Sequence, residues 1–112
     1  MITLGKVLVV NVRNYRGENM IYIGRRNISW GFEESILKNM KRDVGMNRDE
    51  SVDRYRMWLW GEVKKSGDVW DELVRLVNVL IGGNDVILGC WCKPKRCHGD
   101  IVKGCLEWML NK

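Results

Sequence analysis

The sequence predicts a small α/β domain in which helices cover a mixed sheet of about three strands, in the order β-β-α-α-α-β-α. Two observations lead to this class. Short runs rich in β-branched residues lie near both ends of the chain, and the longer stretches among them repeat apolar residues at helical spacing. The length of 112 residues favours a single domain spanning residues 1–112.

The first two predicted strands lie close together in the sequence. Lys6–Val12 is a continuous β-branched run, which is typical of a strand buried on both faces, and Met20–Gly24 follows after a turn. Because this connection is too short for the usual parallel crossover, we expect the two strands to form an antiparallel pair. A third strand is predicted at Asp85–Cys92.

Four segments are predicted to be helical. Phe32–Asp43 can form a short helix, and a stronger helix begins at Asp49, where apolar residues recur at helical spacing. The third helix follows the break at Ser66-Gly67 and ends at Gly82-Gly83. Asp100 can cap the last helix. The residues expected to face the core are Val52, Tyr55, Leu59 and Val63, then Trp70, Leu73, Val74, Val77, Leu80 and Ile81, and finally Ile101, Val102, Cys105, Leu106 and Met109.

Composition limits the class of protein. No apolar run reaches the roughly 18 residues that a membrane span needs, so we expect no membrane partner and a cytoplasmic location. The net charge of +5 favours anionic partners, namely phosphate-bearing small molecules, nucleotides or nucleic acid. A solvated basic surface without any partner is the alternative interpretation.

The segment Gly89–Asp100 (GCWCKPKRCHGD) holds three of the four cysteines, the only histidine and the only proline. One interpretation is a metal site, in which Cys90, Cys92, Cys97 and His98 supply four ligands for zinc or an iron–sulfur cluster. A second is an anion pocket at the start of the last helix, where a lowered thiol pKa would suit catalysis by Cys97 and His98. A third is that the cysteines only fill the core.

Other residues are candidates for ligand contacts. Arg25 can clamp a phosphate or carboxylate, and Trp30 can stack on a base or sugar. Lys95 adds positive charge to the loop, and Gly99 and Asp100 stand at the start of the helix, where backbone N–H groups attract anions. For Asp100, capping the helix is the stronger interpretation.

Several motifs together resemble a known family. Tyr22–Arg25 (YIGR), Ser29–Gly31 (SWG) and above all the closing pattern C-W-C-x-P-x-x-C-H-G-D, from Cys90 to Asp100, are similar to domain of unknown function 4326. That family occurs in bacteria, phages and plasmids. It usually continues W-G-N-P-F, whereas here Trp30-Gly31 runs directly to Phe32.

A weaker similarity links the chain to domain of unknown function 488, on Ile23-Gly24-Arg25-Arg26 and Cys97-His98-Gly99. This resemblance implies that Met20–Gly24 runs parallel to Val86–Cys90, which would bring Arg25 beside Cys97 and His98. Neither family implies an activity.

The leading hypothesis is therefore a nucleotide or phosphate-ligand site at the Cys-His-Gly-Asp motif, with or without a metal. The alternatives are a metal-stabilised module that binds nucleic acid or protein, and a structural protein without ligand. The sequence leaves open whether the protein is an enzyme.

Overall fold

The computed structural model describes residues 3–15, 17, 19–38 and 46–111. It confirms an α/β class, with three strands, three α-helices and one short 3-10 helix among these residues. The elements are β1 (Val7–Asn11), β2 (Met20–Tyr22), η1 (Ile28–Trp30), α1 (Arg48–Lys65), α2 (Asp68–Ile81), β3 (Val86–Cys90) and α3 (His98–Leu110).

The sheet is entirely parallel, so the expectation of a mixed sheet with an antiparallel first pair is wrong. The strand order is β1-β3-β2, and β3 pairs in parallel with both neighbours. Val9 is opposite Leu88, and Ile21 is opposite the same residue on the other side. The parallel pairing of β2 and β3 is the arrangement that the second family resemblance implied.

The short connection misled the prediction because it does not join neighbouring strands. An extended chain spans about 3.3–3.6 Å per residue, so residues 12–19 can bridge roughly 27 Å. That reach covers the two strand spacings of about 4.8 Å each that separate β1 from β2. The strand β3, buried along its whole length, enters between them.

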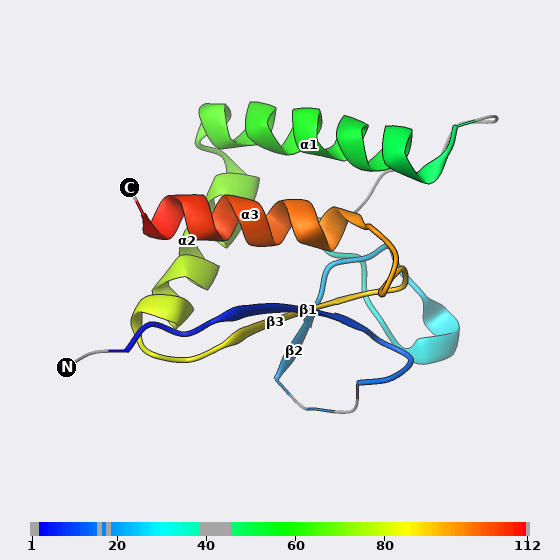
Figure 1. The fold of residues 1–112 in the computed structure, drawn as a ribbon, viewed down its shortest axis with the longest axis horizontal. Helices are drawn as coiled ribbons and strands as arrows, with labels where there is room; N and C mark the ends of the chain where they lie inside the picture. The colour runs from blue at the N-terminus through cyan, green and yellow to red at the C-terminus, as the bar shows by residue number, and fades with distance from the viewer. Residues whose placement is uncertain (1–2, 16, 18, 39–45, 112) are drawn as a thin grey trace.

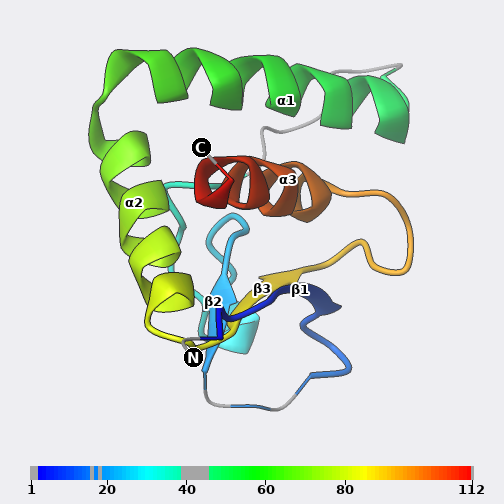
Figure 2. The ribbon, with the colours of Figure 1, turned by 60° about the vertical axis from the view of Figure 1, so that its left-hand side comes forward.

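The helices pack on the sheet in layers (Figures 1 and 2). The helix α3 lies between the sheet and α1, and α2 crosses beside both helices and reaches β3. The core forms where these layers meet, and Leu59, Leu73, Leu88 and Leu106 have no exposed surface. No helix of the described part of the chain is long and apolar enough to span a membrane.

The apolar spacing predicted α1 and α2 well. Val52, Tyr55 and Leu59 of α1 are buried as expected, and so are Leu73 and Leu80 of α2. Both helices end near the predicted glycines, with Ser66-Gly67 between them and Gly82 after α2. Ile81, expected on the core face, is half exposed.

The helix predicted at Phe32–Asp43 is absent over residues 32–38, and residues 39–43 lie outside the described residues. Local contacts hold this segment in a different shape. Phe32 pairs with Asn27 in an isolated bridge, and the Ser35 N–H donates to the carbonyl of Gly24. The segment thereby places Leu37, which is 1% exposed, in the core. This tertiary packing outweighs the weak helical preference of the sequence.

Candidate functional site

The carboxyl ends of β2 and β3 meet at the start of α3, and this junction gathers most of the predicted site residues. His98, the first residue of α3, donates from Nε2 to the carbonyl oxygen of Ile23 at 2.7 Å. Because a carbonyl oxygen only accepts, Nε2 carries the proton. Burial is the main cause that lowers the pKa of His98, and the nearby positive charge of Arg25 adds to it.

His98 is directed into the core. It is 5% exposed, and its ring meets that of Tyr55 edge-on, with centroids 5.0 Å apart. The Tyr55 hydroxyl donates to the carbonyl of Leu37 at 2.7 Å. Burial lowers the pKa of His98 and raises that of Tyr55. The imidazole therefore links β2, α1 and α3 as a neutral, hydrogen-bonded core group.

Cys90 and Cys97 face each other at the base of the loop between β3 and α3. Their Sγ atoms are 3.1 Å apart, and the two residues are 0% and 1% exposed. Cys90 is the last residue of β3, and Cys97 directly precedes α3. Cys92, in the loop, is half-buried, and Cys105 is buried within α3.

The lowered thiol pKa belongs to Cys90 rather than to Cys97. The hydrogen bond from Cys97 lowers the pKa of Cys90 to about 6 against the opposing effect of burial, aided by the backbone N–H groups of Cys92 and Lys93. The same hydrogen bond, together with burial, raises the pKa of Cys97. The expectation of a lowered pKa at Cys97 is thus wrong, because its partner is another thiol at close range.

Asp100 closes the first turn of α3. As the third residue of the helix, it accepts a hydrogen bond from the Cys97 N–H at 3.2 Å, and it forms an ion pair with Lys93. The ion pair raises the pKa of Lys93. Asp100 therefore fastens the loop to the helix start, which agrees with the capping interpretation.

The start of α3 offers little room for an anion. The Gly99 N–H bonds to Cys97, and the Asp100 N–H donates to the carbonyl of Cys97 at 3.1 Å. A Cβ at Gly99 would lie 2.7 Å from Val9 Cγ1. Gly99 thus allows α3 to pack tightly on β1, and the N–H groups of Gly99 and Asp100 are already engaged by Cys97.

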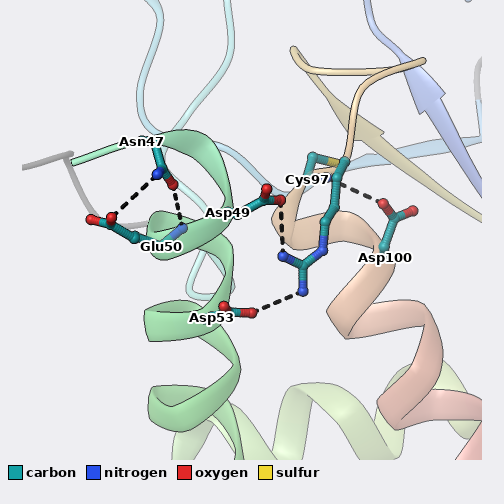
Figure 3. A network of polar contacts seen from close by, with 7 residues as sticks. Asn47, Asp49, Glu50, Asp53, Cys97 and Asp100 are labelled. Atoms are coloured by element: carbon teal, nitrogen blue, oxygen red, sulfur yellow. Dashed lines mark hydrogen bonds and ion pairs between the residues drawn. The ribbon is translucent and has the colours of Figure 1, made fainter.

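The loop is also fastened to α1 through Arg96. Its guanidinium contacts Asp49 at 3.2 Å and Asp53 at 2.9 Å, one helical turn apart on α1 (Figure 3). Asn47 caps the same helix by accepting from the Glu50 N–H. All these groups are at the surface, where solvent screens the charges, so the contact orients the loop and adds little to stability.

Four aromatic rings form a cluster at the carboxyl edge of β2 and β3. Tyr22 stacks on Phe32 with centroids 4.3 Å apart, and the Trp30 ring lies nearly parallel to Phe32 at 6.5 Å. Trp91 meets these three rings edge-on and donates from Nε1 to the Tyr22 hydroxyl at 2.9 Å. Trp30 is 42% exposed, so the cluster presents an aromatic surface to solvent. We call Tyr22, Trp30, Phe32 and Trp91 the aromatic platform.

Three arginines lie near the aromatic platform in space or along the chain. The Arg13 guanidinium lies 5.4 Å from the centroid of the Trp91 ring, within the range of a cation–π contact. Arg25 and Arg26 follow β2 and are exposed. Within residues 3–15, 17, 19–38 and 46–111, no carboxylate forms an ion pair with these three arginines. Lys95 is exposed too, and its backbone N–H donates to the Cys92 carbonyl.

A groove of about 430 Å³ lies at the carboxyl end of β1, beside the same loop. Asn11 connects the two, because its side-chain amide donates to the carbonyls of Trp91 and Lys93. The groove is lined by Val9, Val10, Asn11, Asn14, Tyr15, Lys93 and Pro94. Its size falls within the range of small-molecule sites.

The four predicted metal ligands do not converge. The described residues contain no group of three or more histidine, cysteine, aspartate or glutamate side chains that could hold one metal ion. Only Cys90 and Cys97 approach each other closely, whereas the Nε2 atom of His98 is bonded to Ile23. A closed tetrahedral zinc site needs four ligands, so this arrangement does not fit one.

Fold and site together define a small parallel α/β domain with a cysteine-containing strand–loop–helix junction. The chain belongs to the family described as domain of unknown function (DUF4326), which matches residues 10–108. No curated protein and no solved structure matches it.

Sequence reasoning missed three members of the aromatic platform, namely Tyr22, Phe32 and Trp91. A signal was present, because Tyr22 ends β2 and Trp91 directly follows β3. In a parallel pair, both residues lie at the same edge of the sheet. The resemblance to domain of unknown function 488 implied this pairing, but it was used only to place Arg25 beside Cys97 and His98 and not to place the aromatic residues.

Proposed function

We propose that the protein binds a nucleotide or a related phosphate-bearing ligand at the carboxyl edge of its sheet. The base would stack on the aromatic platform, and arginines would bind the phosphate. The observation that carries this proposal is the exposed Trp30 ring, which lies nearly parallel to Phe32 beside arginines that have no carboxylate partner among the described residues.

Stacking explains why a large aromatic side chain would remain exposed at this edge. Trp30 and Phe32 are inclined by only 11°, and Trp30 is 42% exposed, so a planar base can lie parallel to these rings against the exposed part of Trp30. Stacking of a base on an aromatic side chain contributes about 1–3 kcal/mol and tolerates any base, because every base has a π-face.

The phosphate would be bound by arginine rather than by the start of α3. Arg25 follows β2 after a single glycine, and its planar guanidinium can make two parallel hydrogen bonds to a phosphate. Arg13, above Trp91, supplies positive charge on another side of the platform. The N–H groups of Cys97, Gly99 and Asp100 at the start of α3 already have partners.

Calorimetric titration with purine and pyrimidine mononucleotides tests this proposal. Saturable binding is expected, and Trp30→Ala should weaken it roughly 10- to 100-fold through lost stacking. Arg25→Ala should abolish measurable binding while leaving the melting temperature nearly unchanged, because its side chain is exposed.

Two surface variants serve as controls for this titration. Trp108→Ala and Arg56→Ala remove the same side-chain types from exposed positions on α3 and α1. They should bind like the wild type. Absence of any nucleotide binding, or equal losses in the control variants, would contradict the proposal.

Single-stranded nucleic acid is the second candidate ligand. Ile28, in the same short helix as Trp30, is 78% exposed, and an exposed surface suits a strand better than an enclosed pocket would. Oligonucleotide binding that falls steeply between low and moderate salt, without mononucleotide binding, would favour this class.

The metal-bearing alternative has its own test. Elemental analysis of protein purified without chelator or oxygen should find less than one zinc or iron per chain if the thiols remain a pair. One tightly held metal ion per chain would instead require Cys92 or His98 to move toward Cys90 and Cys97.

A further inference from the structure

We propose that Cys90 and Cys97 form a reversible disulfide when the protein meets a hydroperoxide. The two Sγ atoms are 3.1 Å apart, so a shift of about 1 Å brings them to the bonded distance of about 2.05 Å. In the part of the chain that the structure describes, no other two thiols are in contact. This inference is independent of the ligand that the aromatic platform binds.

The pair is placed to react without disturbing the fold. Cys90 is the last residue of β3, and Cys97 is the N-cap residue of α3. The strand therefore fixes the position of one cysteine, and the helix fixes that of the other. The six residues between them, Trp91 to Arg96, form a loop that is half-buried to exposed. The sulfurs are buried beneath this loop, so local opening of the loop would admit a small oxidant, while a protein thiol would be excluded.

The reaction balances with hydrogen peroxide as the oxidant. The Cys90 thiolate attacks one peroxide oxygen, the O–O bond breaks, and the leaving hydroxide takes up a proton to become water. Cys90 is then a sulfenic acid. The sulfur of Cys97 attacks it, the S–O bond breaks, and the departing hydroxide combines with the thiol proton as a second water. Two cysteines lose two electrons in total, and the peroxide is reduced.

A disulfide here would close a ring around functional residues. The ring contains Trp91 of the aromatic platform and Lys93 of the groove. Because a disulfide restricts the unfolded chain, the oxidised protein should melt at a higher temperature than the reduced protein.

Peptide mapping after peroxide treatment tests the proposal. The full-length reduced protein is treated with hydrogen peroxide in the presence of a chelator, its remaining thiols are alkylated, and the digest is analysed by mass spectrometry. The expected product lacks two hydrogen atoms, carries a Cys90–Cys97 cross-link, and returns to two free thiols with dithiothreitol.

Serine variants identify the pair. Cys90→Ser and Cys97→Ser should each prevent the cross-link, whereas Cys92→Ser and Cys105→Ser should form it as the wild type does. A cross-link through Cys92 or Cys105 would overturn the proposal. Oxidation of the half-buried Cys92 to sulfinic acid in the folded wild-type protein, with Cys90 and Cys97 left unlinked, would also overturn it. This outcome is read on the wild type alone and does not depend on whether the variants fold.

Discussion

At the scale of single residues, two buried polar side chains hold the site's supporting structure in place. Tyr55 and His98 lie edge to face in the core, and each donates a hydrogen bond to a backbone carbonyl outside its own helix. Their acceptors, at Leu37 and Ile23, belong to irregular or strand-end segments. Such segments depend on side-chain donors, because buried carbonyls need partners.

Tyr55→Phe should lower the free energy of unfolding by about 1–3 kcal/mol, because it leaves the buried Leu37 carbonyl without its donor. Urea unfolding measures this effect. Tyr15→Phe is the matched control, since the Tyr15 hydroxyl donates to Asn19 at the exposed surface and its loss should change little. Equal effects of the two substitutions would show that the Tyr55 hydroxyl contributes nothing specific.

His98 should make stability depend on pH below about 6.5, the ordinary histidine pKa. Burial lowers its pKa in the folded protein, so the unfolded chain binds the proton more readily. Above about pH 6.5 the residue is neutral in both states, and below it the free energy of unfolding falls as the pH falls.

Comparison with His98→Gln isolates this effect, because both proteins retain the same carboxylates and Cys90, and His98 is the only histidine. The stability advantage of the wild type over the variant should shrink between pH 7 and pH 5. A difference that stays constant over this range would show that His98 is not buried in its neutral form.

At the scale of elements, α3 is positioned by a close approach to the sheet. A Cβ at Gly99 would meet Val9 Cγ1 at 2.7 Å, whereas a Cβ at Gly104, in the same helix, would meet no atom within 4 Å. The first glycine is needed for packing. The second lies on the exposed side of the helix, where glycine only weakens it.

Gly99→Ala should therefore destabilise the protein by about 1–3 kcal/mol through overpacking. Gly104→Ala should stabilise it by about 0.5–1 kcal/mol through helix propensity. Thermal or urea unfolding of the pair separates packing from propensity. Stabilisation by both substitutions would mean that α3 does not pack against β1 as described.

The elements also show which parts of the fold the sequence can predict. Periodicity located α1 and α2, because residues such as Tyr55, Leu59 and Leu73 face the core at fixed helical intervals. Periodicity carries no information on strand order. The pairing of β2 with β3 joins residues far apart in the chain, and only the weaker resemblance to domain of unknown function 488 pointed to it.

The candidate site was predictable in its location and less so in its chemistry. The Cys-His-Gly-Asp motif was identified from its composition, but the sequence could not show that His98 is directed into the core. Nor could spacing show that Cys90 and Cys97 would pair while Cys92 stays in the loop. These outcomes depend on how the loop between β3 and α3 places the helix against the sheet, which residue spacing does not determine.

At the scale of the whole molecule, one end of the sheet carries all the features that suggest ligand binding. The aromatic platform, the arginines and the groove gather at the carboxyl edge. Open parallel sheets place their ligands at this edge, where strands end and loops begin. The helix α1 covers the side of α3 that faces away from the sheet, and the core lies between the sheet and the helices (Figure 2).

The most direct test of this account is a titration of the ¹⁵N-labelled protein with a mononucleotide, followed through the indole N–H signals of its six tryptophans. If the nucleotide binds to the aromatic platform, the signals of Trp30 and Trp91 should shift with saturation, while those of Trp58, Trp60, Trp70 and Trp108 stay in place. Single Trp→Phe substitutions assign the signals. Shifts confined to the other four indoles, or no shift at all, would contradict a ligand site on the aromatic platform.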